Sequence, residues 1–211
     1  MSIRRDPTMV KIRFLLAAAT ATAGLAILAP ATAQASTTSA CNPALVAPQG
    51  SLIGNFWRSK GGQKSVYGCP TTKEFGFSDK KGSWQRFRNG KIVWSPNLGN
   101  GTLVRAYFTR DRVFLAWSGL GRDWDYFNVL WDKNGTGNRQ VRVARQTPWS
   151  GAFSLPVDVY DPGPEGEEYA SCSAHGGCTT TFSFSVEGCD RGTFKSDCSP
   201  WSIRTSVTRE N

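Results

Sequence analysis

The side chains that could carry acid–base chemistry are few, and they do not form a recognisable catalytic set. His175 is the only histidine in the 211-residue chain, so any serine or cysteine nucleophile that needs an imidazole base would depend on it. It lies between Cys172 and Cys178 among small residues, which indicates a surface loop. The sequence contains no G-x-S-x-G elbow, phosphate-binding glycine loop or pair of zinc-binding histidines. We therefore expect no catalytic residue, no metal and no other cofactor.

Paired carboxylates are the other source of catalysis that the sequence could offer. Residues 36–101 contain Glu74 and Asp79 as their only acids, among nine lysines and arginines. A glycosidase needs one carboxyl group whose pKa is raised by an apolar pocket, whereas neighbouring cations lower the pKa of a carboxyl group. We therefore expect that the chain is not an enzyme.

Large aromatic rings and cations alternate in the first half of the chain, and this pattern is suited to binding. Partly exposed rings stack on sugars or bases, while neighbouring cations hold phosphate or carboxylate groups. The rings fit the core of a small module equally well, and the sequence leaves this alternative open for the three tryptophans. The candidate ligand-binding residues are Trp57, Arg58, Trp84, Arg86, Arg88, Lys91 and Trp94.

The positive charge of the chain is concentrated in the same region. The formal net charge is +9. Residues 36–101 carry nine basic and two acidic side chains, whereas residues 102–211 carry 12 basic and 13 acidic ones. A polyanion is therefore expected to meet the first half of the chain. The alternative is that these charges only keep the protein soluble.

The positioning elements are predicted to be short strands. Large apolar residues recur at every second position at 113–117, 127–131, 141–143, 153–155 and 182–186, and a period of two indicates half-buried strands. Glycine-rich and proline-rich turns separate these runs. The pattern predicts about seven strands in an antiparallel β-sandwich. Residues 52–57 could form one short helix, so the fold class is mainly β with at most one short helix.

The N-terminus has the pattern of an export signal. A short basic region precedes an apolar run at 14–29, which Pro30 ends, and Ala33-Gln34-Ala35 offers the small-x-small pattern of a cleavage site. We predict a signal peptide over 1–35 that is cleaved after Ala35, with Met1 or Met9 as the start. A membrane anchor is the alternative, but the run is short and rich in alanine and threonine. No later apolar run is as long, so we expect a protein that is secreted or held at the cell wall without a membrane span.

Six cysteines follow the predicted cleavage site, and an even number in an exported chain indicates disulfide bonds. Six cysteines allow 15 pairings, and their spacing favours three local ones. The expected bonds are Cys41–Cys69, Cys172–Cys178 and Cys189–Cys198. A zinc site is the alternative, but the C-x-x-C spacing and a second histidine are both missing. Residues 36–49 are rich in serine, threonine, alanine and proline and are predicted to be a flexible leader held at Cys41.

Two segments of the first half resemble an LGFP repeat. They are Val66-Tyr-Gly-Cys-Pro-Thr-Thr72, which is rich in turn residues, and a strand, glycine turn and strand that end at Trp94-Ser-Pro96. Tyr67 and Cys69 stand where the family usually has leucine and phenylalanine, and one copy is visible where the family usually has several. The resemblance covers about residues 50–104, and we place the module at 50–101. It implies an exported actinobacterial protein that associates with the cell wall.

The second half, residues 102–211, is similar to a fibronectin type III domain. The alternating runs at 113–117, 127–131 and 182–186 resemble its second, third and sixth strands. Phe182 stands where that family normally has a tyrosine. The resemblance implies a seven-stranded antiparallel sandwich that acts as a spacer or as a surface for protein partners.

The favoured hypothesis is a non-catalytic, secreted cell-envelope protein whose first module binds an anionic cell-wall polysaccharide or another polyanion. One alternative is a secreted nucleic-acid-binding protein, which would use the same rings and cations. The other is a small secreted hydrolase or effector.

Overall fold

The computed structural model describes residues 40–159, 171–172, 178–192 and 196–210, without the side chains of residues 171, 172 and 178. Within these residues α1 (Leu52–Ser59) is the one α-helix, and the 3-10 helices are η1 (Pro43–Leu45), η2 (Gly62–Lys64) and η3 (Pro96–Leu98). The strands are β1 (Phe75–Gly76), β2 (Ser83–Phe87), β3 (Gly90–Trp94), β4 (Leu103–Phe108), β5 (Arg112–Ser118), β6 (Tyr126–Lys133), β7 (Arg139–Ala144), β8 (Gly151–Pro156), β9 (Ser171–Cys172), β10 (Cys178–Asp190), β11 (Asp197–Cys198) and β12 (Thr205–Glu210). The predicted signal peptide and His175 lie outside the described residues.

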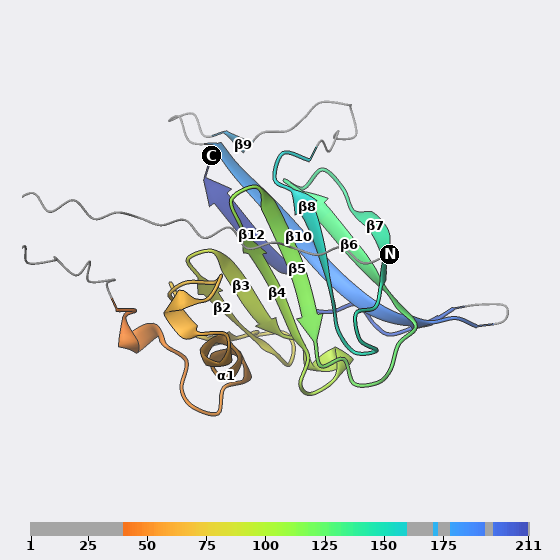
Figure 1. Cartoon of the computed structure of the whole chain (residues 1–211), viewed down its shortest axis with the longest axis horizontal. Coiled ribbons are helices and arrows are strands. Elements are labelled where there is room, and N and C mark those ends of the chain that lie inside the picture. Colours follow the sequence, from red (N-terminus) through yellow and green to blue (C-terminus); the bar gives the residue numbers. More distant parts are fainter. Residues whose placement is uncertain (1–39, 160–170, 173–177, 193–195, 211) are drawn as a thin grey trace, which may run out of the picture. The chain divides into compact units, whose positions relative to one another are not determined.

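The strands form two antiparallel sheets (Figure 1). The first sheet has the order β1-β2-β3-β4-β5-β8. The second has the order β11-β10-β6-β7, and β9 and β12 also pair with β10. Figure 1 shows β4 and β5, in green, crossing the long blue strand β10 of the other sheet. The prediction of a mainly β fold with an antiparallel sandwich and one short helix is confirmed.

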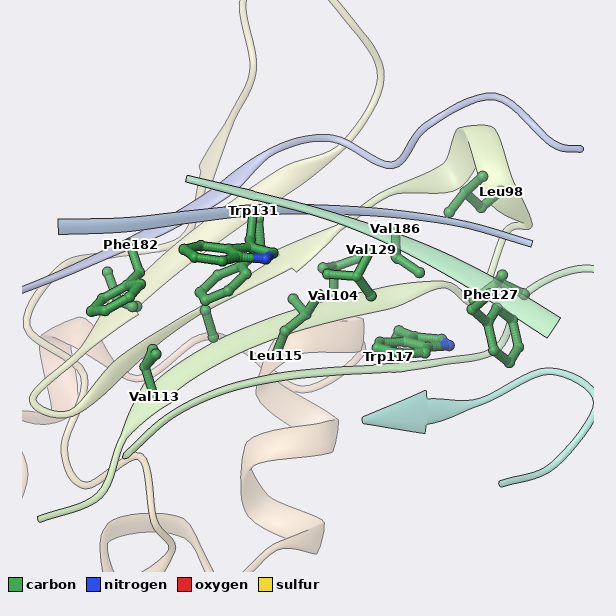
Figure 2. Packing of buried hydrophobic residues seen from close by; sticks show 14 of the residues in the cluster. Leu98, Val104, Val113, Leu115, Trp117, Phe127, Val129, Trp131, Phe182 and Val186 are labelled. Atoms are coloured by element: carbon green, nitrogen blue, oxygen red, sulfur yellow. The ribbon is translucent and has the colours of Figure 1, made fainter. Parts of the chain in front are cut away.

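The main core lies between the two sheets and follows from the alternation in the sequence. Val113, Leu115 and Trp117 of β5 are fully buried, as are Phe182, Phe184 and Val186 of β10. Figure 2 shows these side chains between the strands of the two sheets, with Trp117 close to Phe127. The two rings meet edge to face, with 5.1 Å between their centroids. Because successive residues of a strand point to opposite faces, the alternating runs place one apolar row of each strand in this core.

The described part of the second half contains nine strands, of which β9 and β11 have only two residues and come in addition to the seven that the sequence predicts. In the described part of residues 102–211, seven strands are longer than two residues: β4, β5, β6, β7, β8, β10 and β12. The second, third and sixth of these are β5, β6 and β10, which contain the runs at 113–117, 127–131 and 182–186.

A second core lies on the other face of the first sheet, beneath α1. Ser51 caps the helix by accepting a hydrogen bond from the Gly54 backbone N–H (3.0 Å), as serine commonly does at this position. The helix then buries Ile53 and Trp57 against the sheet. The residues of this core are Ile53, Trp57, Tyr67, Phe87, Ile92 and Leu103.

The first sheet continues across the domain boundary that the sequence predicts at 101/102. This boundary falls in the turn between β3 and β4, which pair with Ile92 opposite Arg105 and Val93 opposite Val104. The LGFP-like hairpin β2–β3 is therefore an extension of the sheet that β4, β5 and β8 supply to the sandwich. Local motifs mark the hairpin in the sequence, but they carry no information about the strand that pairs with its free edge.

Two of the three predicted disulfide bonds are confirmed, Cys41–Cys69 and Cys189–Cys198. The third prediction lies outside the described side chains, although the backbones of residues 172 and 178 are directly opposite each other in the β9–β10 pair. Residues 40–49 are packed against the module, with Ala47 buried. A composition typical of flexible chain does not reveal the hydrogen bond that the buried Gln85 Nε2 donates to the Leu45 carbonyl (2.7 Å).

Candidate functional site

The pairing of β1, β2 and β3 gathers four of the exposed or half-buried side chains on one face of the first sheet. Phe75 is opposite Trp84 in the β1–β2 pair, and Arg86 is opposite Lys91 in the β2–β3 pair. Directly opposite residues of an antiparallel pair share a face, as do residues two apart in one strand. These four side chains therefore form one group, which we call the Trp84 cluster: Phe75, Trp84, Arg86 and Lys91.

The Trp84 indole ring is the centre of this cluster. The centroid of the Phe75 ring lies 5.2 Å from the centroid of the Trp84 ring, at a tilt of 40°. Lys91 Nζ lies 4.8 Å from the Trp84 ring centroid and Arg86 Cζ lies 5.8 Å from it. Trp84 is half-buried and Phe75 is 46% exposed. The cluster thus offers two aromatic rings to solvent with two cations beside them.

The hydrophobic core of the sandwich supports the cluster from one side. Trp84 is opposite Val93, Val93 is opposite Val104, and Val104 is opposite Trp117 in successive strand pairs. These residues form one row across the sheet. Its inner members, Val104 and Trp117, belong to the buried core, and its outer member is the half-exposed Trp84. The β2–β3 pair therefore fixes the position of Trp84 at the edge of this row.

The electrostatics of the Trp84 cluster favour an anionic partner. In the part of the chain that the structure describes, no carboxylate forms a salt bridge with Arg86 or Lys91. Burial lowers the pKa of Lys91, and the positive charge of Arg86 lowers it further. Each effect disfavours the protonated lysine, because the charge is partly desolvated and faces a like charge. A bound anion would stabilise the protonated lysine and so offset both effects.

Two of the predicted site residues, Trp57 and Arg58, have structural roles instead. Trp57 is only 7% exposed, stacks on Phe87 in the second core, and donates its indole N–H to the Gly68 carbonyl (2.9 Å). The Arg58 guanidinium donates to the carbonyls of Ala47 (2.8 Å) and Pro48 (3.0 Å). The sequence left open whether Trp57 belongs to the core or to a binding site. The structure places it in the core, because α1 turns this ring toward the sheet.

Trp94 and Arg88 are also separated from the cluster. Trp94 is opposite Ser83 and Leu103, so it lies on the face that α1 covers, and its indole N–H donates to the Asn100 carbonyl (2.8 Å). Arg88 is exposed in the β2–β3 turn and lines a separate groove of about 580 Å³ together with Arg110 and Arg209.

Of the seven predicted residues, the structure brings together Trp84, Arg86 and Lys91. Phe75 was not among the predicted residues, and its signal in the sequence is an aromatic residue beside the turn residues that precede β2. Arg110 and Arg209, which line the groove with Arg88, were not predicted either. Arg209 lies on β12 of the other sheet, far from Arg88 in the sequence, so its approach leaves no local signal.

Glu74 and the cysteines of the one described metal-like group are occupied by other contacts. Glu74 accepts hydrogen bonds from Ser51 Oγ and from Ser83 Oγ (2.6 Å), which joins the start of α1 to β2. The one described group with the composition of a metal site is Glu187, Cys189 and Cys198. The two cysteine sulfurs of this group are bonded to each other and so offer no thiolate to a metal ion.

Comparison with known protein families supports the first resemblance. The family model of the LGFP repeat matches residues 68–124. No curated protein and no solved structure matches the chain. The matched segment contains β2 to β5 and thus includes Trp84, Arg86 and Lys91, and it crosses the predicted boundary at 101/102. The match indicates a module associated with the cell surface. In the described residues, no helix has the length and apolarity that crossing a membrane requires.

Proposed function

We propose that the chain is a non-catalytic, exported cell-envelope protein whose Trp84 cluster binds an anionic cell-wall polymer. The observation that carries this proposal is the pair of exposed or half-exposed rings beside two cations that have no acidic partner among the described residues. The rings can stack on sugar faces, and the cations can hold carboxylate or phosphate groups. The LGFP match supports the cell-surface setting of this binding.

Export and disulfide formation support the same location. Residues 1–35 have the pattern of a signal peptide, and two disulfide bonds join cysteines of the described chain. Disulfide bonds persist in oxidising compartments and are rare in the cytosol. The sandwich of β4 to β12 would act as a spacer or as a surface for a protein partner, a role that its resemblance to a fibronectin type III domain implies.

Co-sedimentation with purified cell walls over a series of salt concentrations tests this function. Trp84→Ala is expected to weaken retention about 5- to 150-fold, which corresponds to the roughly 1–3 kcal/mol of one stacking ring. Trp149→Ala is the matched control, since this tryptophan is 49% exposed in the turn before β8 and far from the LGFP-like hairpin in the strand order. Retention should fall as salt rises, because salt screens exposed charges. Equal retention of the two variants, independent of salt, would end the proposal.

A secreted nucleic-acid-binding protein is the second candidate. The observation that favours it is the groove of about 580 Å³ lined by Arg88, Arg110 and Arg209, because guanidinium groups suit phosphate. Glu210 lines the same groove and opposes this charge. Gel-shift competition between single-stranded DNA and solubilised wall polymer separates the two candidates. Displacement of the DNA by the polymer at equal charge concentration is expected for the cell-envelope function.

A further inference from the structure

A pocket of about 290 Å³ lies on the face of the first sheet that α1 covers. The residues that line the pocket include Phe56, Lys60, Ser65, Tyr67, Arg105 and Tyr107. Arg105 is opposite Ile92 in the β3–β4 pair, and Ile92 is opposite Gln85 in the β2–β3 pair. The pocket is therefore on the opposite face from the Trp84 cluster and is a separate site.

Arg105 is a buried cation without a counterion in the described part of the chain. Arg105 is only 8% exposed, and no described carboxylate forms a salt bridge with its guanidinium group. Its Nη1 donates one hydrogen bond, to Ser118 Oγ (3.2 Å). Its buried Nε has no hydrogen-bond partner. Burying an unpaired charge is costly, and a fold rarely retains one without a reason.

Aromatic rings surround this charge but do not neutralise it. Arg105 Cζ lies 4.4 Å from the centroid of the Phe56 ring, close enough for a cation–π contact. Burial raises the pKa of Tyr67 to about 12 and also raises the pKa of Tyr107, even though the positive charge of Arg105 acts in the opposite direction. Both phenols are therefore neutral at physiological pH. The site keeps its positive charge and lacks an acceptor for Nε.

Ser65 is a second unpartnered polar group of the same pocket. Its buried Oγ has no hydrogen-bond partner, and it lines the pocket together with Arg105. Buried polar atoms without partners are few in native proteins, and each calls for an explanation. Two of them at one pocket, beside an uncompensated cation, are explained together by an anionic ligand that accepts hydrogen bonds.

We propose that this pocket binds a carboxylate group carried on a small ring or apolar body. With Nη1 bonded to Ser118, the guanidinium edge formed by Nε and Nη2 is a planar fork, and such a fork matches the two oxygens of a carboxylate. Phe56, Tyr67 and Tyr107 supply aromatic walls for the body of the ligand. Lys60 is exposed and adds a second cation. A volume of about 290 Å³ limits the enclosed part to one sugar ring or one amino-acid residue.

Titration of the full chain with small probes, followed by NMR and thermal unfolding, tests the inference. The probes are glucuronate, N-acetylalanine, glucose and inorganic phosphate. Either carboxylate is expected to bind and to raise the Tm of the protein, with glucose at least tenfold weaker. Binding of glucuronate alone assigns the carboxylate of a sugar, and binding of N-acetylalanine alone assigns that of a peptide terminus. Failure of both carboxylates to bind, or inorganic phosphate binding as tightly as they do, overturns the proposal.

Variants of Arg105 separate a binding role from a structural one. Arg105→Met removes an unpaired buried charge, so it is expected to abolish carboxylate binding without lowering the Tm. Arg105→Lys keeps the charge but lacks the planar fork, so this variant is expected to bind the carboxylate probes at least tenfold more weakly. It provides the test if Arg105→Met does not fold. Lys64→Met is the matched control, because Lys64 is exposed outside the pocket. Unchanged binding in the lysine variant contradicts the inference. Trp84→Ala should leave carboxylate binding in this pocket unchanged, so the proposals for the two sites are tested independently.

Discussion

Arg86 and Lys91 lie directly opposite each other across the β2–β3 hairpin, on the face that carries Trp84. Like charges in this position destabilise a strand pair, and no described carboxylate forms a salt bridge with either. The hairpin therefore keeps an arrangement that is unfavourable in the free protein and favourable when an anion lies over it.

The first prediction concerns the coupling of these two charges. Arg86→Gln is expected to raise the pKa of Lys91 toward its ordinary value, because one of the two effects that lower this pKa is the charge of Arg86. Burial, the larger effect, remains. NMR titration of the lysine side-chain signals measures the shift. Arg142→Gln, on β7 of the other sheet, is the control and should not move it; an unchanged Lys91 pKa in Arg86→Gln would show that the two charges do not interact.

The second prediction concerns Gln85, a buried amide that joins three segments of the module. Its residue is 1% exposed, and its Nε2 donates to the carbonyls of Leu45 (2.7 Å) and Thr72 (3.0 Å). Gln85→Leu leaves these carbonyls without their donor and is expected to lower the free energy of unfolding by about 1–3 kcal/mol. Urea unfolding measures the loss. Gln140→Leu on the exposed face of β7 is the control, with a change within about 0.5 kcal/mol; equal effects would contradict the assigned role.

Periodicity predicted the strands and the main core because both depend on local alternation. In β5 burial alternates along the strand, and the three inward residues, Val113, Leu115 and Trp117, are fully buried. The role of Gln85 was not predictable, since its partners lie far away in the sequence. Gln85 is a polar residue between Trp84 and Arg86, so the sequence alone predicts that it is exposed. Its burial becomes evident only when the position of the N-terminal segment is known.

The third prediction is a loss of stability at alkaline pH that depends on Tyr67. Burial raises the pKa of this phenol from 10.0 to about 12 in the folded protein, so the folded state disfavours the phenolate. The resulting stability is present below pH 10 and is lost as the pH rises toward about 12, by on the order of 2 kcal/mol. Tyr67→Phe removes this contribution and should give a flatter profile of unfolding free energy over that range. A constant difference between the variant and the natural protein from pH 9 to 12 would contradict the prediction.

The fourth prediction concerns the disulfide bond between Cys41 and Cys69. It closes a loop with a sequence separation of 28, and loop-closure entropy then gives about 3–4 kcal/mol of stabilisation. Replacing both cysteines by alanine is expected to lower the free energy of unfolding by this amount in urea titrations. A loss below about 1 kcal/mol would mean that the hydrogen bonds of Gln85 and Arg58 hold the N-terminal segment without the disulfide.

The three tryptophans of the candidate site show where sequence reasoning about function stops. All three lie within three residues of a basic residue in the sequence, and that pattern does not distinguish them. The structure does: Trp57 faces the sheet from α1, Trp94 donates its N–H to Asn100 on the same covered face, and Trp84 lies at the open end of a row that begins in the core. Which face of a hairpin a helix covers depends on tertiary packing, which neither composition nor spacing contains.

The most direct test of the account asks which ring touches the polymer. In a protein with ¹⁵N-labelled tryptophan, a soluble anionic polymer prepared from cell walls is added and the indole N–H signals are followed. The account predicts that the Trp84 signal shifts in proportion to bound polymer, while those of the buried Trp57 and Trp117 stay in place. A polymer that binds and shifts the Trp149 signal but leaves Trp84 unchanged would contradict it.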